Sequence, residues 1–498
     1  MPPLKNLISA VASLGLLTLT TQAEKPNIVF IFADDLGWGD VQCYNPENGK
    51  IPSPCMDQLA AEGMIFTDAH TSSSVCTPSR YSVITGRYNW RTHLQQGVIW
   101  GYSPALITPD RETVASFLQK NGYNTACIGK WHIGMDLPSK NGKPTEGRKP
   151  AEINVDWQGE IQNGPTDIGF DYYWGISASL DMAPLAYIEQ KKFIEADYLT
   201  NTKQRTPKGP NFDAMRTLQD ITDQSVKYIA EKAQGKKPFF MYIPLTSPHT
   251  PILPTEEWEG KSGLNKYADF VMQTDHEVGR IVAALDKAGV KENTIVIMSS
   301  DNGCSNLARI PDLKEMGHYP NGNFRGAKKS LYEGGHRVPF IVRWPAQVEA
   351  GSLSDQTVCL TDFFATCADA ISAPLPPTAA EDSVSFLPAL KGETINTERQ
   401  GVIHHSYAGE FAYRKGKWKL LLLAKESNAR MKDQLYDLEA DPFETKDLYD
   451  ENPEVVANLI ACLKADIANG RSTKGPQLKN DVENISLWKE NPPSKKKK

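Results

Sequence analysis

The chain has 498 residues, of which 40% are hydrophobic and 23% charged, and its net charge at pH 7 is −6. This length suits two domains or one large domain with an appendage, and the composition is that of an ordinary globular protein. The mild acidity gives no indication of a nucleic-acid partner or of an anionic membrane surface. Any anion site must therefore be built locally, from a few cations and backbone amides.

The first 23 residues have the pattern of an export signal. Lys5 supplies a positive charge, an apolar stretch follows at residues 7–20, and small residues at 21–23 precede an expected cleavage before Glu24. An uncleaved anchor is the alternative, but the apolar stretch is short and interrupted by Ser and Thr. We expect an exported protein without stable membrane insertion. It would be periplasmic or extracellular, or in a lysosome-like lumen if the host is eukaryotic.

Five short segments are apolar almost throughout, which is typical of strands buried on both faces of a sheet. They are residues 27–33, 124–129, 238–245, 294–300 and 338–344. Amphipathic helices ending at or near glycine are predicted over residues 56–63, 112–122 and 267–289. This alternation predicts an α/β fold in which helices cover both faces of a large, mostly parallel sheet.

Polar residues follow four of these predicted strands, at the point where each strand ends. They are Asp34 and Asp35, Lys130 and His132, His249, and Asp301 and Asn302. Ligands of an open α/β sheet bind beyond the carboxyl ends of its strands, so we expect these residues on one rim. Each alone is explained by a turn, a cap or a structural role, but turns do not require four strands to end this way. The oxygen ligands among them favour Ca²⁺ over zinc.

Cys76 stands in the stretch SSSVCTPSRYSVITGR, residues 72–87. Pro78 is favoured in the first turn of a helix, so a helix is predicted from about Thr77, with Arg80 on the face above Cys76. A helix N-terminus favours anions and would lower the pKa of a thiol. The eight cysteines are widely and irregularly spaced. Cys76 is therefore half of a disulfide, a thiol nucleophile, or the starting material for another group.

The composition changes after about residue 370. A Pro- and Ala-rich connection at 373–383 precedes a predicted hairpin at 411–423, a strand and turn at 435–449 and a helix at 453–470. These elements predict a small α+β subdomain with an antiparallel sheet. A run of lysines at 495–498 is expected to be solvated. The expected organisation is a signal peptide at 1–23, a catalytic domain at 24–372 and a C-terminal subdomain at 373–498.

Several blocks of the sequence resemble the type I, formylglycine-dependent sulfatases, which are arylsulfatase-like members of the alkaline phosphatase superfamily. CTPSR at 76–80 matches the C-x-P-x-R core, GKWHIG at 129–134 is similar to the second signature, and RGAKKSLYEGGHRVP at 325–339 is similar to a later block. Ala327 stands where the family often has glycine. The resemblance covers nearly the whole mature chain. It implies a large mixed, mostly parallel sheet sandwiched by helices, with a smaller C-terminal subdomain.

The resemblance also implies an unusual nucleophile. In this family a maturation enzyme oxidises the motif cysteine to Cα-formylglycine before the chain folds. The hydrated aldehyde then attacks the sulfur of a sulfate ester, and its second hydroxyl expels sulfate after the alcohol has left. By this resemblance one Ca²⁺ would be held by residue 76 and by Asp34, Asp35, Asp301 and Asn302.

Roles for the remaining residues follow from the same resemblance. Arg80 would orient the diol, His132 would be the base for the elimination, and His249 would protonate or hydrogen-bond the leaving oxygen. Lys130 and Lys328 would bind the sulfate oxygens. Lys328 is chosen over Lys329 because it fits the R-G-x-K register of the family.

The implied function is hydrolysis of a sulfate ester, and a sulfated carbohydrate such as a galactose-type 6-sulfate is the favoured substrate. A phosphonate monoester or phosphodiester hydrolase on the same scaffold is one alternative. A catalytically silent carbohydrate-binding protein is another. Residues 175–190, Trp100 and the polar stretch around His318 are candidates for a sugar subsite, although Trp100 and Tyr187 are equally explained as packing residues.

Overall fold

The computed structural model describes residues 24–148, 152–395, 399–423, 425–426, 429–430 and 432–489. The expected signal peptide and the lysine run at 495–498 lie outside the described residues. All eight cysteines lie within them, and all are free thiols. None of the helices in the described ranges is both long enough and apolar enough to cross a membrane.

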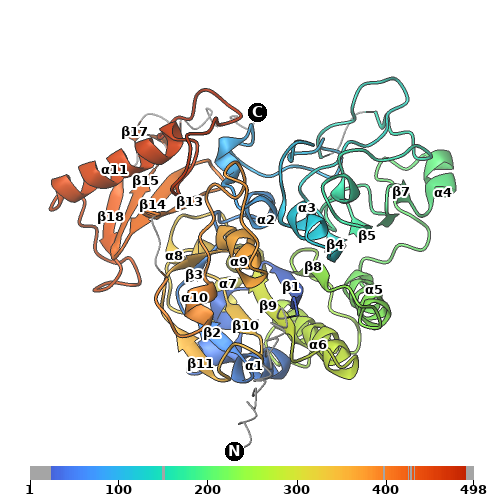
Figure 1. Ribbon diagram of the computed structural model, residues 1–498, viewed down its shortest axis with the longest axis horizontal. Coiled ribbons are helices and arrows are strands. Elements are labelled where there is room, and N and C mark those ends of the chain that lie inside the picture. Colours follow the sequence, from blue (N-terminus) through green and yellow to red (C-terminus); the bar gives the residue numbers. More distant parts are fainter. Residues whose placement is uncertain are drawn as a thin grey trace, which may run out of the picture.

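A ten-stranded sheet forms the centre of the molecule, in the order β11-β2-β10-β9-β1-β8-β4-β5-β6-β7 (Figure 1). Its strands are β1 Asn27–Asp34, β2 Met64–Phe66, β4 Asn124–Lys130, β5 Tyr172–Ile176, β6 Ile188–Glu189, β7 Lys192–Phe193, β8 Phe239–Pro248, β9 Thr294–Ser300, β10 Phe340–Arg343 and β11 Ser352–Ser354. Neighbouring strands from β9 to β5 pair in parallel, whereas β10 is antiparallel to β9. The predicted mixed, mostly parallel sheet is confirmed.

Alternate residues of each central strand enter two different hydrophobic cores. In β1, Ile28, Phe30 and Phe32 face one core, and Val29 and Ile31 face the other. The first core includes residues of α2 Cys76–Thr85, α3 Val114–Lys120 and α9 Phe363–Ala370. The second includes residues of α1 Pro54–Ala61, α5 Thr217–Lys232 and α6 Lys266–Lys287. Burial on both faces explains why these strands are apolar almost throughout.

A separate four-stranded antiparallel sheet follows in the C-terminal part, beside the central sheet in Figure 1. It consists of β13 Val402–His405, β14 Phe411–Lys415, β15 Trp418–Leu422 and β18 Gln434–Asp437, and α11 Pro453–Ala468 packs on β14. His405 of β13 forms a bridge with Ser73. The second sheet is thereby joined to the segment that leads into Cys76.

The shorter elements connect these layers. They are β3 Ala69–His70, which pairs with β12 Val358–Cys359, and the short helices α4 Ala196–Asn201, α7 Ile310–Glu315, α8 Glu333–His336 and α10 Leu387–Leu390. Two further strands, β16 Lys425–Glu426 and β17 Ala429–Arg430, pair with each other.

Candidate active site

The polar residues predicted at the strand ends meet at one edge of the central sheet. Asp34 ends β1 and Lys130 ends β4, while His249 directly follows β8 and Asp301 directly follows β9. The sheet order places β9, β1, β8 and β4 side by side, so their carboxyl ends form one rim. The sequence therefore predicted both the strands and the edge at which their polar residues gather.

Two residues of this rim have a left-handed backbone. The φ angle is 67° at Asp35 and 55° at His132, a region that residues other than glycine rarely adopt. Such conformations persist where surrounding contacts fix them, and they are common at functional sites. At Asp35 the backbone N–H donates to Asp301 Oδ1 at 3.1 Å, which links two of the predicted cation ligands.

The carboxylates of the rim are buried together. Asp35 Oδ1 accepts hydrogen bonds from Asn302 Nδ2 at 2.7 Å and from Lys328 Nζ at 2.5 Å. The backbone N–H of Lys328 donates to Cys304 O at 3.0 Å, which holds this lysine beside the loop after β9. Burial and the nearby Asp34 raise the pKa of Asp301 to about 7. So many acidic groups out of water require compensating positive charge.

Two oxygen atoms of this cluster accept no hydrogen bond, although Arg80 Nη2 lies 3.5 Å from one of them, Asp34 Oδ1. Asp34 Oδ1 and Asn302 Oδ1 are buried, and neither has a hydrogen-bond partner within the described part of the chain. Leaving a buried acceptor unpaired costs about 1–3 kcal/mol, so such atoms call for an explanation. Carboxylate and amide oxygens are the ligands that a hard divalent cation prefers. The residues present thus fit the metal ion that the sequence predicts at this rim.

Two cations of the protein share the site with these carboxylates. Arg80 donates from Nε and Nη2 to Asp301 Oδ2 at 3.0 and 2.7 Å, and Lys130 Nζ donates to Asp34 Oδ2 at 2.6 Å. Burial acts to raise the pKa of Asp34, but His249, Lys130 and Arg80 together hold it well below its usual value. Asp34 is therefore ionised at neutral pH.

Cys76 is the first residue of α2 and is 3% exposed. The predicted helix at this position is present, with Arg80 four residues further on. The expected low pKa of the thiol is wrong, because burial raises the pKa of Cys76 despite the opposing charges of Lys130 and Lys328. Desolvation of a thiolate outweighs the helix N-terminus here. An unmodified Cys76 is thus a poor thiolate nucleophile.

His132 and His249 lie at the same rim. His132 Nε2 is 3.0 Å from Ile99 O, so this nitrogen carries the proton, and the buried Nδ1 has no partner among the described residues. Burial and the charges of Lys130 and Arg80 lower the pKa of His132 well below its usual value. His132 is therefore a neutral imidazole with a free lone pair, as a general base requires.

His249 is held by residues on both sides of the rim. Its Nδ1 lies 2.5 Å from Thr250 O and 3.3 Å from Ser179 Oγ, and its Nε2 lies 3.8 Å from Asp35 Oδ2. Ser179 was not predicted as part of the catalytic site. It lies just after β5, so the strand-end rule that found the other residues applies to it as well.

The remaining sequence candidates occupy different places. Lys329 is exposed, with its ammonium 5.1 Å from the ring centre of Tyr407. Trp100 is half-buried, and the Arg148 guanidinium lies 5.3 Å from its ring centre. Arg148 also pairs with Asp181 at 3.2 Å, two residues beyond Ser179. Trp100 follows Ile99, whose backbone carbonyl contacts His132, so the chain at Trp100 is one residue from a rim contact.

Two other candidates for a sugar subsite are a buried histidine and a half-buried tyrosine. His318 is fully buried, and its Nε2 lies 2.9 Å from Asp40 Oδ1. His318 itself therefore does not line a subsite, whereas such a role for the polar stretch around it stays a prediction. Tyr187 stacks on Trp174 with ring centres 4.4 Å apart and donates from its hydroxyl to Asp220 at 2.7 Å, which is the packing role that the sequence left open.

A second buried cluster of ionisable side chains joins the catalytic part to the C-terminal sheet, and the sequence did not predict it. Lys419 Nζ is 2.9 Å from His336 Nε2, His336 Nδ1 is 3.1 Å from His70 Nδ1, and His70 Nε2 is 2.8 Å from Asp68 Oδ1. These contacts form one continuous chain from Lys419 to Asp68. His336 Nε2 also lies 3.0 Å from Leu331 O, and His70 Nε2 also lies 2.9 Å from Arg414 Nη1. Burial lowers the pKa of both histidines, so both imidazoles are neutral.

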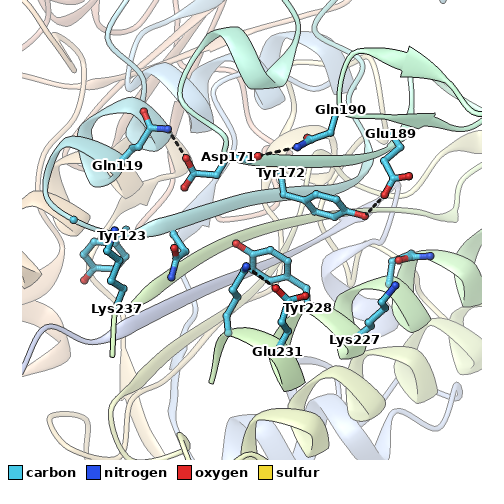
Figure 2. Close-up of a pocket in the computed structure, with 14 residues that line it drawn as sticks. Gln119, Tyr123, Asp171, Tyr172, Glu189, Gln190, Lys227, Tyr228, Glu231 and Lys237 are labelled. Carbon is cyan, nitrogen blue, oxygen red and sulfur yellow. Dashed lines mark hydrogen bonds and ion pairs between the residues drawn. The ribbon is translucent and has the colours of Figure 1, made fainter. Parts of the chain in front are cut away.

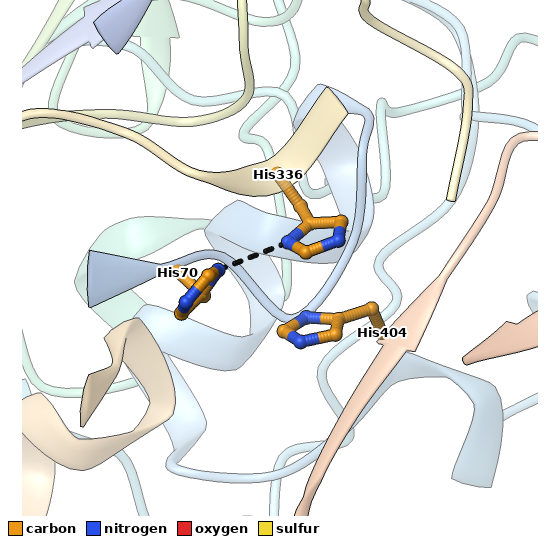
Figure 3. Close-up of side chains that lie close together, drawn as sticks. All are labelled: His70, His336 and His404. Atoms are coloured by element: carbon orange, nitrogen blue, oxygen red, sulfur yellow. Dashed lines mark hydrogen bonds between the residues drawn. The ribbon is translucent and has the colours of Figure 1, made fainter. Parts of the chain in front are cut away.

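The third histidine of this cluster, His404, stacks on His336 with ring centres 3.8 Å apart and an interplanar angle of 10° (Figure 3). Its Nδ1 donates to Thr71 O at 2.9 Å. The ring nitrogens of His70, His336 and His404 are close enough to suggest a metal site. Stacked rings cannot both direct their in-plane lone pairs at one ion, however, and Lys419 places a positive charge beside them. This geometry is that of a hydrogen-bonded support rather than a metal centre.

Comparison with known proteins identifies the family of the chain. The Sulfatase family model matches residues 26–373, and the model for the C-terminal part of N-sulphoglucosamine sulphohydrolase matches residues 322–473. N-acetylgalactosamine-6-O-sulfatase of Bacteroides thetaiotaomicron is 32% identical over 93% of this chain and 99% of its own. Human arylsulfatase A is 29% identical over 91% of this chain and 90% of its own.

Solved structures give the same result. One solved structure, described as part of the metabolism of multiple glycosaminoglycans by Bacteroides thetaiotaomicron, superposes on this chain with a TM-score of 0.78 and is 31% identical to it. The superposition covers 89% of this chain and 99% of the chain in that structure. These similarities favour sulfate ester hydrolysis over the phosphonate monoester or phosphodiester alternative. The chain belongs to the sulfatase family and is a sulfuric ester hydrolase.

Proposed function

We propose that the substrate is a sulfated carbohydrate and that a 6-sulfate on a galactose-type sugar is the ester cleaved. The similarity to N-acetylgalactosamine-6-O-sulfatase of Bacteroides thetaiotaomicron, which spans nearly the full length of both chains, carries this proposal. N-acetylgalactosamine-6-sulfatase of the rat is also similar, at 28% identity. The aromatic and charged side chains of Trp100, Arg148 and Asp181 beside the rim supply contacts that suit a sugar ring.

Two groups beyond the encoded side chains belong to the proposal. A maturation enzyme oxidises Cys76 to Cα-formylglycine, which supplies a diol nucleophile in place of the poorly ionised thiol. Asp34, Asp35, Asp301 and Asn302, together with the modified residue 76, hold one Ca²⁺, which supplies positive charge for the nucleophile and the sulfate. The unpaired oxygens of Asp34 and Asn302 support this assignment.

The other side chains of the rim bind the sulfate, orient residue 76 and transfer protons. Lys130 and Lys328 bind the sulfate oxygens and stabilise the charge that develops on them. Arg80, held by Asp301, orients residue 76. His132 accepts a proton at its unpartnered Nδ1 during elimination of sulfate. His249, when protonated at Nε2 near Asp35, donates to the leaving oxygen.

A panel of defined sulfated saccharides tests the substrate, with released sulfate as the readout. We expect turnover of galactose-type 6-sulfates, and turnover confined to other esters would contradict the assignment. Mass spectrometry of the peptide containing residue 76, from protein made with a maturation system, tests the nucleophile. An unmodified thiol in protein that turns over sulfate esters would contradict it. Sulfated glycan binding with no sulfate release under any maturation condition would instead favour the silent binding protein.

We also propose that the chain is exported and that residues 1–23 are removed. The charge, apolar stretch and small residues of this segment support the proposal. Within the mature chain we propose a catalytic domain at 24–372 and a C-terminal subdomain at 373–498. N-terminal sequencing of protein from its native host tests the cleavage, and a first residue other than Glu24 would move or remove the boundary.

A further inference from the structure

Asp35, one of the proposed cation ligands, is held from the interior of the protein by a tyrosine. The hydroxyl of Tyr267, the second residue of α6, lies 3.1 Å from the backbone carbonyl of Asp35 and 2.5 Å from Asp40 Oδ2. Its one proton is therefore shared between two acceptors in a three-centre hydrogen bond. Since Asp35 has a left-handed backbone, with φ at 67°, this contact helps to fix a conformation that the residue would otherwise rarely adopt.

Asp40 is fully buried at the centre of this arrangement. Its Oδ2 accepts from the Gly37 backbone N–H at 2.7 Å as well as from Tyr267, and its Oδ1 lies 2.9 Å from His318 Nε2. Gly37 is two residues after Asp35, so the carboxylate closes the loop that follows β1. Three donors satisfy this buried carboxylate, which anchors the loop from the side away from the proposed cation.

His318 extends the chain of contacts and has a defined tautomer. The Lys50 backbone N–H donates to its Nδ1 at 3.1 Å, so the ring proton is on Nε2, from which it is donated to Asp40. The ring is fully buried, and both of its nitrogens are engaged. His318, which does not line a sugar subsite, thus orients the loop after β1 through Asp40.

The segment 318–321 also contacts this loop through its backbone. Pro320 O accepts from the Gly39 backbone N–H at 2.7 Å. A Cβ atom at Gly39 would lie 2.2 Å from Tyr319 O, so the close approach of the two backbones requires glycine. The backbone beside Asp40 is therefore fixed by the same segment that carries His318.

The same segment reaches the loop after β9, which carries other proposed ligands. Asn321 Oδ1 accepts from the Cys304 backbone N–H at 2.8 Å, two residues beyond Asn302. The loops that carry Asp35 and Asn302 are therefore both bonded to one segment behind the rim. Ligands that are fixed before binding hold a cation more tightly, because less ordering is required when the ion enters.

We propose that Tyr267, Asp40 and His318 are positioning residues, which set the affinity of the rim for Ca²⁺ through Asp35 without touching the ion, the sulfate or residue 76. The proposal rests on the proposed metal site. Loss of a hydrogen-bond partner of a metal ligand commonly lowers the affinity for the ion by about 10- to 100-fold. We expect losses of this size when the chain of contacts from His318 to Asp35 is broken.

Calorimetric titration of Ca²⁺ into metal-free, matured protein tests the tyrosine. Tyr267→Phe removes only the hydroxyl, and we expect the Kd for Ca²⁺ to rise about tenfold. Tyr172→Phe is the matched control, because it also removes a hydroxyl that donates to a carboxylate, that of Glu189 at 3.0 Å. This pair lies in a groove at the amino ends of β4 and β5, the ends opposite the rim (Figure 2). The control should keep the wild-type Kd, and a wild-type Kd in Tyr267→Phe would overturn the proposal.

Two substitutions of His318 separate positioning from a general loss of stability. His318→Leu leaves Asp40 Oδ1 without its donor, whereas His318→Gln keeps an N–H near the position of Nε2. We expect the Kd for Ca²⁺ to rise about 10- to 100-fold in the leucine variant and to stay within about threefold of the wild type in the glutamine variant. His404→Leu, at a buried histidine outside the rim, should keep the wild-type Kd. Equal rises in His318→Leu and His404→Leu would overturn the proposal, and Tyr267→Phe decides the question if His318→Leu does not fold.

Turnover at saturating Ca²⁺ distinguishes positioning of the cation from a direct part in the chemistry. We expect the kcat of Tyr267→Phe to return to within about threefold of the wild type when the ion is saturating. A loss of kcat that Ca²⁺ does not restore would overturn the assignment to cation positioning. A wild-type protein that binds no Ca²⁺ would contradict the proposed metal site itself, and this proposal with it. The affinity measurements need no substrate, so they apply whichever sulfate ester is cleaved.

Discussion

Two buried clusters of ionisable side chains differ in which of their atoms are left without a hydrogen bond. At the catalytic rim, Asp34 Oδ1 and Asn302 Oδ1 accept no hydrogen bond within the described structure, although Arg80 Nη2 lies 3.5 Å from Asp34 Oδ1. In the cluster around His336, Lys419 donates to Glu333 Oε1 at 2.8 Å and to Glu444 Oε1 at 2.7 Å, and Arg414 pairs with Asp68 at 2.8 Å. The density of carboxylates and histidines is high in both clusters. In the histidine cluster, His404 Nε2 is also buried without a hydrogen-bond partner among the described residues, but it belongs to a ring stacked on His336. The rim leaves oxygen atoms of two residues open, which supports the cation proposed there.

The two clusters also serve different parts of the fold. The rim is made by residues at the ends of neighbouring strands, whereas the histidine cluster joins segments of the chain that are far apart in sequence. The ring Nδ1 of His404, in β13, donates to the backbone carbonyl of Thr71. The backbone carbonyl of the neighbouring His405 accepts from the Ser74 backbone N–H at 3.1 Å. The second cluster thus supports the segment that precedes Cys76. We expect damage to the rim to abolish chemistry and damage to the histidine cluster to lower stability.

The largest expected effect is at Asp301. Asp301→Asn keeps the shape of the side chain but removes a negative charge from the cation site, and we expect kcat to fall by at least about 10³-fold, the upper range for loss of one electrostatic group. Sulfate release by matured protein is the measurement. Asp312→Asn, at a partly exposed aspartate of α7, is the control. Near-normal turnover by Asp301→Asn would show that the rim does not depend on a cation.

The two adjacent lysines of the 325–332 segment provide an internal comparison. Lys328 bonds Asp35 at the rim, whereas Lys329 lies over Tyr407. Lys328→Ala should lower kcat about 10²-fold, because a charge that stabilises the sulfate oxygens is lost. Lys329→Ala should change kcat less than about threefold. Equal losses in the two variants would contradict the register chosen here.

Lys419 tests the second cluster. Lys419→Met leaves Glu333 and Glu444 buried without their shared cation, and we expect a loss of about 3–5 kcal/mol in the free energy of unfolding. Denaturant unfolding followed by fluorescence is the measurement. Lys417→Met, at a lysine whose side chain is 44% exposed beside Asp437, is the control and should unfold at nearly the same denaturant concentration as the wild type. Two results would contradict the assignment of a purely structural role to the histidine cluster. One is a loss of unfolding free energy in Lys419→Met no larger than that of the control. The other is a folded Lys419→Met protein that no longer binds the divalent cation proposed at the rim.

The smallest expected effect is at His404. His404→Leu leaves Thr71 O without its donor and should cost about 1–3 kcal/mol of stability. His404→Asn retains an N–H near the position of Nδ1 and should recover most of this loss. If the asparagine and leucine variants unfold alike, the hydrogen bond to Thr71 contributes little, and stacking on His336 accounts for the role of His404.

The sequence was informative where function follows strand periodicity. The apolar runs predicted β1, β4, β8 and β9, and the rule that ligands bind beyond strand ends brought Asp34, Lys130, His249 and Asp301 together. The cluster of His70, His336 and His404 could not be predicted, because no local pattern links residues that meet only after the second sheet docks. The raised pKa of Cys76 and the interior position of His318 depend on burial, which the helix and loop signals do not encode.

Cation content measured together with turnover tests the central claim most directly. Matured wild-type protein and Asp301→Asn would be equilibrated with Ca²⁺, freed of excess ion and analysed for bound metals and for sulfate release from the same sample. The account predicts one Ca²⁺ per wild-type chain, and loss of both the ion and the turnover in the variant. Sulfate release by wild-type protein that holds no divalent ion, or a transition metal retained in both proteins through the histidine cluster, would contradict it.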